Sequence, residues 1–167
     1  MKRSIFAIVL LFAAACNPKK HEFVGGDNFS VSMPEAATRA TSTNDEGLPE
    51  TEWEVKHTGL TTAELYTVKQ SCYRELLNPN DELQINEALL ALNGIKPIES
   101  RRSAIIAKET GRSVPAMFSA TQETATGVVI NHVSVVDGHC LITVGARLNS
   151  DNAGEVAQFI SSVTIFK

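Results

Sequence analysis

Two runs rich in β-branched residues flank an Asp-Gly dipeptide near the end of the chain. Residues 128–136 and 139–147 are dense in Val, Ile and Thr, and Asp137-Gly138 separates them. Such runs predict strands, and Asp-Gly between them tolerates the positive φ angles of a two-residue type I′ turn. We therefore expect a β-hairpin in which Val135 pairs with Cys140, so that Cys140 lies on the apolar face of the hairpin.

The chain after residue 28 alternates strand signals with two helix signals. Apolar alternation predicts further strands at residues 29–33, 52–57, 62–73, 101–108, 113–121 and 163–166. A helix over 63–77 is the alternative for the third of these. Capping residues predict helices at 81–94 and from Ser150 or Asp151, and residues 35–50 show little periodicity and predict a loop.

Short connections between strands favour antiparallel pairing, and helices must cover the apolar faces of a sheet. The expected fold class is therefore α+β. We expect a mostly antiparallel sheet of about six to seven strands that is covered by helices, as a helix–sheet–helix sandwich.

The N-terminus carries a short apolar segment. Lys2 and Arg3 precede residues 5–15, which contain no charge. As a helix this run would span about 16 Å, roughly half of the hydrocarbon core of a bilayer. It is therefore typical of a signal peptide rather than of a transmembrane helix.

The end of this segment, Ala13-Ala14-Ala15-Cys16, resembles the lipobox of bacterial lipoproteins. In that family the cysteine thiol is modified with diacylglycerol, the peptide is cleaved before it, and the new amino terminus is often acylated. The resemblance implies that residues 1–15 are a signal peptide and that Cys16 carries the lipid. The alternative is a plain secretory peptide that is cleaved near Ala15 and leaves Cys16 unmodified.

Residues 17–28 contain Pro18 and Gly25-Gly26, and we expect them to form a flexible tether, followed by a single domain at 29–167. Asn17 follows the cysteine where an Asp would resemble an inner-membrane retention signal. We therefore expect the protein in the bacterial cell envelope, on the outer membrane facing the periplasm. The formal charge of −4 becomes −6 when Lys2 and Arg3 are removed, so we expect anionic headgroups to repel the domain.

Several short segments resemble the PsbP/Mog1-like domain family. They are FSVSMP at residues 29–34, the pair Gly111-Arg112, the long hairpin, and the closing FISSVTIF at residues 159–166. The resemblance implies a similar α+β sandwich and, since members of the family are generally accessory or binding proteins, a similar kind of role.

The exported domain has two cysteines besides Cys16, namely Cys72 and Cys140. Thiols of an exported protein that lie near each other are normally oxidised. We therefore expect a disulfide between Cys72 and Cys140, and the alternative is two buried free cysteines that act as small hydrophobic residues.

The sequence has no nucleophile elbow, HExxH, CxxC or phosphate-binding loop. The four histidines (His21, His57, His132 and His139) are too scattered to predict a metal site, and the net negative charge disfavours nucleic acid as a partner. Trp53, Tyr66 and Tyr73 are expected in the core rather than in a pocket.

We therefore predict no catalytic residues, no cofactor and no metal. The expected function is that of a lipid-anchored, non-catalytic binding or accessory module with a protein partner. The alternative is a small-ligand carrier with a cavity between sheet and helix.

Overall fold

The computed structural model describes residues 21–58, 63–93, 99–106, 113–123, 128–148 and 152–166. Its strands are β1 (Glu22–Gly25), β2 (Phe29–Met33), β3 (Thr38–Thr43), β4 (Pro49–Thr58), β5 (Ala63–Cys72), β6 (Glu99–Ile106), β7 (Ser113–Glu123), β8 (Val128–Asp137), β9 (Cys140–Leu148) and β10 (Thr164–Ile165). Its helices are α1 (Glu82–Asn93) and α2 (Ala153–Ser161).

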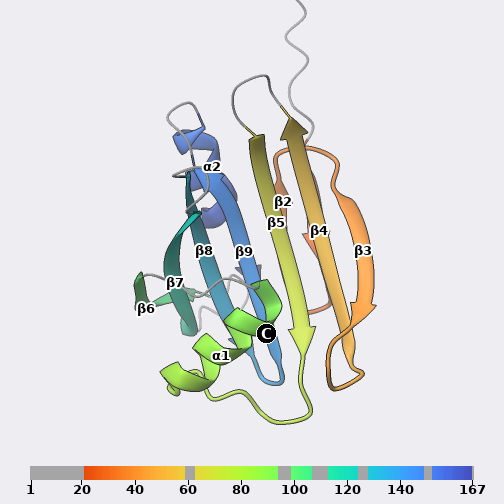
Figure 1. The fold of residues 1–167 in the computed structure, drawn as a ribbon, viewed down its shortest axis with the longest axis vertical. Coiled ribbons are helices and arrows are strands. Elements are labelled where there is room, and N and C mark those ends of the chain that lie inside the picture. The colour runs from red at the N-terminus through yellow and green to blue at the C-terminus, as the bar shows by residue number, and fades with distance from the viewer. Residues whose placement is uncertain are drawn as a thin grey trace, which may run out of the picture.

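The strands form two sheets. A large sheet of seven strands has the order β3-β4-β5-β9-β8-β7-β6, and a small sheet of three strands has the order β1-β2-β10 (Figure 1). Every strand pair among the described residues is antiparallel. The fold is thus α+β with a mostly antiparallel sheet, as predicted, but a second sheet shares the covering of the large sheet with the helices.

The main core lies between the small sheet and one face of the large sheet. Alternate residues of β2 point into it and are fully buried, because period-two alternation places them on one face. Phe29 of β2 meets the edge of Trp53 from β4, and Tyr66 of β5 meets the edge of Phe159 from α2. The described part of this core comprises Val24, Phe29, Val31, Met33, Trp53, Val55, Tyr66, Val68, Ile142, Val144, Ala146, Val156, Phe159 and Ile165.

A smaller core lies on the opposite face of the large sheet, where α1 packs. Ile85 and Ala88 of α1 contact Leu141, whose side chain points away from the main core because its neighbour Ile142 points into it. Strand β9 is therefore buried on both faces. Helix α1 lies near the start of β9, and α2 lies near its end (Figure 1).

The hairpin forms as predicted, but its register differs. Asp137 pairs with Cys140, so Gly138 and His139 are the turn residues, and Val135 pairs with Ile142 instead of Cys140. Gly138 has φ +59°, and every described residue with a positive φ is a glycine, so φ of His139 is negative. A positive φ confined to the first turn residue is the pattern of a type II′ turn rather than type I′. Because the shift is two residues, each side chain keeps its predicted face.

Strand β3 contradicts the loop predicted at 35–50. All six of its residues are exposed, so the sequence carries no alternation of buried and exposed side chains. The strand exists because its backbone pairs with β4 along its whole length, from Thr38 opposite Glu54 to Thr43 opposite Pro49.

Strand β1 corrects the predicted tether. Residues 22–25 lie inside the segment expected to be flexible, but they pair with β2, and Val24 is buried in the main core. Burial of this one valine, together with the ladder to β2, orders the segment.

The other elements match their predicted positions closely. Strand β5 forms where a helix over 63–77 was the alternative, and α1 falls within the predicted 81–94. The cap of α2 is Asn152, one residue after the predicted Asp151. Among the described residues, no helix has the length and apolar character needed to cross a membrane.

Candidate functional site

Strand β3 is an open edge of the large sheet. It is the last strand in the sheet order, and no described strand pairs with its outer side. Proteins normally protect such edges with proline, lysine, bulges or very short strands. Strand β3 has six residues in unbroken register, contains no proline or lysine, and its one charged side chain, Arg39, lies over the ring of Trp53 at 5.7 Å.

One hydrogen bond at the end of β3 shows which of its backbone groups face β4 and which face the open side. The amide of Asn44 donates to the carbonyl of Leu48 (2.9 Å), so the backbone groups of Asn44 point inward, toward β4. Inward and outward residues alternate in an antiparallel pair. The N–H and C=O groups of Arg39, Thr41 and Thr43 therefore point to the open side.

Asn44 organises the turn that joins β3 to β4. Its Nδ2 donates to the carbonyl of Cys72 (2.7 Å) and to Oγ of Ser71 (3.2 Å). Its Oδ1 accepts hydrogen bonds from the amides of Glu46 (3.1 Å) and Leu48 (3.0 Å). One side chain thus shapes the turn and fastens it to the end of β5.

A pocket of 370 Å³ opens beside this turn and begins at the last residue of β3. We call it the turn pocket, and it is lined by Thr43, Asn44, Asp45, Glu46, Glu50, Ser71 and Tyr73. Three of these residues are carboxylates, and the structure holds one of them in place. The backbone N–H of Arg74 donates to Oε2 of Glu46 (2.8 Å), and its guanidinium donates to the Glu46 carbonyl (3.1 Å).

Tyr73 contributes a neutral hydroxyl to the turn pocket. Burial raises the pKa of this hydroxyl above its usual 10.0, and a hydrogen bond with Ser71 opposes the shift. The carboxylates of Glu50, Glu46 and Asp45 raise the pKa of Tyr73 further, since they disfavour a second negative charge nearby. The pocket therefore offers acceptors and one phenol, a set suited to a cationic or hydrogen-bond-donating group.

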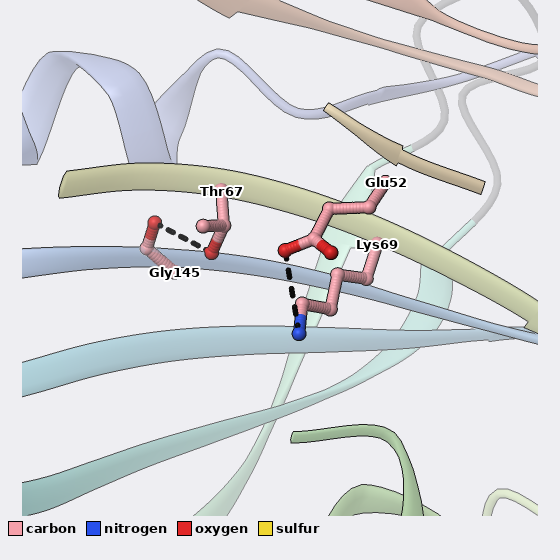
Figure 2. A network of polar contacts seen from close by, with 4 residues as sticks. All are labelled: Glu52, Thr67, Lys69 and Gly145. Atoms are coloured by element: carbon pink, nitrogen blue, oxygen red, sulfur yellow. Dashed lines mark hydrogen bonds and ion pairs between the residues drawn. The ribbon is translucent and has the colours of Figure 1, made fainter. Parts of the chain in front are cut away.

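The face of the large sheet next to this edge is polar. Figure 2 shows Lys69 of β5 bridging to Glu52 of β4 at 3.4 Å, with both side chains partly exposed. On the same face, the Thr67 hydroxyl donates to the carbonyl of Gly145 (3.3 Å) (Figure 2). Partly exposed pairs of this kind contribute little to stability, and Lys69 and Lys56 share this face with the glutamates of β4.

A second depression lies between α2 and β2. It measures 190 Å³ and is lined by His21, Ser32, Pro34, Glu155, Gln158, Phe159 and Ser162. Carriers of small molecules have cavities of at least about 300 Å³. This depression is smaller than the cavity between sheet and helix that a small-ligand carrier would require.

Helix α1 exposes apolar side chains on the side that faces away from the sheet. Leu83 is 69% exposed and Leu90 is 44% exposed, and Leu76 in the preceding loop is 66% exposed. Leu83 and Leu90 are seven residues apart and therefore lie on one stripe of the helix.

The structure joins Cys72 and Cys140 in a disulfide, and the two residues are direct partners in the β5–β9 ladder. Cys16 lies outside the described residues. Trp53 and Tyr66 are in the main core as predicted, and Tyr73 is partly buried against the smaller core and also lines the turn pocket.

The four histidines lie on different elements. His21 precedes β1, His57 is in β4, His132 is in β8 opposite Gly145, and His139 is in the exposed β8–β9 turn. The described side chains include no group of three or more residues that could hold a metal ion.

No family model matches the chain, and no curated protein sequence matches it. Sequence reasoning missed the β3 edge because an edge strand with six exposed residues has the composition of a loop. The one local signal was Asn44-Asp45-Glu46-Gly47, a run of turn-forming residues between Thr-rich and Glu-rich segments that can pair.

Proposed function

We propose that the protein is a lipid-anchored binding module of the bacterial cell envelope, and that its partner is a protein segment in extended conformation. The observation that carries this proposal is the open, regular edge of β3, which leads into the turn pocket. Extended peptides bind such edges by adding a strand, since main-chain hydrogen bonds give affinity and adjoining pockets give specificity.

The chemistry of the turn pocket defines one feature of the partner. Asp45, Glu46 and Glu50 place carboxylates where a strand added to β3 would pass Thr43. A lysine or arginine of the added strand would meet opposite charge there. We therefore propose an extended segment that carries a basic side chain at this position.

The anchoring part of the proposal rests on the sequence. Ala13-Ala14-Ala15-Cys16 follows an apolar run too short to span a bilayer, so we propose cleavage before Cys16 and lipidation of its thiol. Two or more acyl chains give stable attachment where one chain is marginal. We place the anchored domain on the outer membrane, facing the periplasm.

We also propose that the domain is related to the PsbP/Mog1-like family, whose members are generally accessory or binding proteins. Supporting features are FSVSMP, which includes strand β2, and the closing FISSVTIF, which spans the end of α2 and β10. A shared fold does not by itself define a partner, so the binding proposal stands on the β3 edge.

The edge is tested by a photo-crosslinking amino acid at Thr38 in cells that express the protein. We expect capture of a partner that Thr41→Pro abolishes and Thr41→Val preserves. Proline removes an outward N–H at residue 41 but no ladder bond, so the folded domain should keep its melting temperature. Capture that survives Thr41→Pro, or that also occurs from a crosslinker at Leu83 on α1, would refute strand addition at β3.

The anchor is tested separately by mass spectrometry of the mature N-terminus and by fractionation of Cys16→Ser. We expect a lipid on Cys16 and release of the variant from the membrane fraction. An unmodified Cys16, or a serine variant that remains with the membrane, would refute the anchoring.

A further inference from the structure

The small sheet has one face in the main core, and we call its other face the free face. Alternation places Phe23 of β1, Ser30 and Ser32 of β2, and Thr164 of β10 on this free face, opposite their buried neighbours. The ladder confirms the arrangement, because Phe23 pairs with Ser32 and Thr164 pairs with Ser30. Within these three strands the free face carries no charge, and Phe23 is 73% exposed.

The neighbouring surface of α2 is similar. Its exposed residues are Ala153, Gly154, Ala157, Gln158 and Ser161, and its one charged residue, Glu155, is partly buried and lines the depression between α2 and β2. The carboxylate of Glu22 is turned away from the free face and accepts a hydrogen bond from the amide of Ala37 (2.6 Å).

The free face adjoins the start of the chain. Six residues separate Cys16 from Phe23, and the seven steps along the chain span no more than about 25 Å even when fully extended. Because β1 begins at Glu22, a lipid on Cys16 would hold the small sheet close to the bilayer surface. Lys19 and Lys20 lie within this short connection.

The carboxylates of β4 lie on the side of the large sheet that is away from the small sheet. Glu50, Glu52 and Glu54 alternate along β4 with Trp53 and therefore lie on the face of the large sheet that points away from the small sheet. Arg39 lies on the opposite face, over the ring of Trp53. The three carboxylates are thus on the side away from the anchor, where Lys56 of β4 and Lys69 of β5 share the same face.

We infer that the free face of the small sheet is a membrane-contacting surface, with Phe23 in the interfacial region. This inference rests on the proposed lipidation of Cys16. Aromatic side chains favour the membrane interface, and basic residues near an anchor are attracted to anionic lipids. The domain then rests on the bilayer by the free face of the small sheet and turns the carboxylates of β4 outward, instead of standing away from the membrane.

The test uses the mature lipidated protein, reconstituted in vesicles of phosphatidylcholine and phosphatidylglycerol with bromine on the acyl chains. Phe23→Trp places a fluorophore on the free face, and Leu83→Trp is the matched control on the exposed side of α1. The native Trp53 is buried and supplies a constant background. We expect blue-shifted and bromine-quenched emission from Phe23→Trp only, with less quenching when Lys19 and Lys20 are both replaced by Gln.

Each outcome is decisive. Unquenched emission from Phe23→Trp, or equal quenching of both variants, overturns the membrane contact. Mass spectrometry of the same preparation reports the lipid on Cys16. A lipidated protein with unquenched Phe23→Trp overturns this inference alone, whereas an unmodified Cys16 overturns the anchoring proposal and the inference together.

Discussion

Replacement of Asn44 by alanine should destabilise the domain more than its position in a surface turn suggests. The side chain makes four hydrogen bonds, to Ser71, Cys72, Glu46 and Leu48. The bonds to Ser71, Cys72 and Leu48 are partly buried, so water does not fully replace them. The bond from the amide of Glu46 is exposed, and its loss should cost little.

Three partly buried bonds at about 1 kcal/mol each predict a loss of about 3 kcal/mol in the free energy of unfolding. For a domain of this size, 1 kcal/mol corresponds to about 2–4 °C, so the melting temperature should fall by about 6–12 °C. Ser71→Ala removes one of the same bonds. In a Ser71→Ala background, the effect of Asn44→Ala should therefore be smaller by about 1 kcal/mol.

Urea unfolding followed by circular dichroism measures all four proteins of this cycle. The slope of free energy against urea concentration should stay constant, because the turn is small compared with the surface exposed on unfolding. A loss below about 1 kcal/mol for Asn44→Ala, or independent effects of the two substitutions, would show that Asn44 does not fasten the β3–β4 turn to β5.

Three further perturbations test other parts of the fold. Removal of the disulfide by Cys72→Ala and Cys140→Ala, which frees a chain segment with a sequence separation of 68, should cost up to about 4 kcal/mol in urea unfolding, and an unchanged midpoint would contradict this. Burial raises the pKa of Tyr66, so its contribution to stability should be complete below about pH 10 and decline as the pH rises further, a decline that Tyr66→Phe should reduce in alkaline titrations. Gly138 has φ +59° and open space around it, so Gly138→Ala should destabilise the domain by about 1 kcal/mol through backbone strain alone. Gly154 in α2 also meets open space, and Gly154→Ala should stabilise the domain by about 0.5–1 kcal/mol because alanine favours the helix. Thermal unfolding that shows the same sign for both substitutions would contradict this reasoning.

Elements with two distinct faces could be predicted from the sequence. Strand β2 was expected at residues 29–33 and occurs there, because Phe29, Val31 and Met33 alternate with serines. Trp53 and Val55 gave β4 in the same way. In each strand, one face enters the core and the other meets solvent or a polar neighbour. The alternation of apolar and polar residues in the sequence therefore predicts which side chains are buried.

Elements that depend on a distant partner could not be predicted. Strand β3 has no buried side chain, and β1 has only Val24, so both owe their conformation to backbone pairing with another strand. The hairpin register has a similar explanation. Asp-Gly is compatible with more than one turn type, and the observed register is the one that also sets Cys140 opposite Cys72 on β5.

The candidate site at the β3 edge could not be predicted from the sequence for the same reason. An edge exists only once the order of the strands is known, and several strand orders are compatible with this set of strands. Asn44 reaches Ser71 and Cys72 across sequence separations of 27 and 28, and no local pattern indicates those contacts. Cys72 and Cys140, in contrast, could be paired from the sequence, since the predicted domain at 29–167 contains two cysteines and therefore offers one pairing within the domain.

The cross-link between β5 and β9 has a consequence for proteolysis. Cys72 and Cys140 close the chain at the base of a long excursion that contains α1, β6, β7 and β8. A protease that cuts once between residues 73 and 139 would leave two fragments covalently joined at that base. The nicked protein would migrate as one species in a denaturing gel and separate into two only after a reductant is added, so a protease that cuts this segment once would not by itself release either fragment.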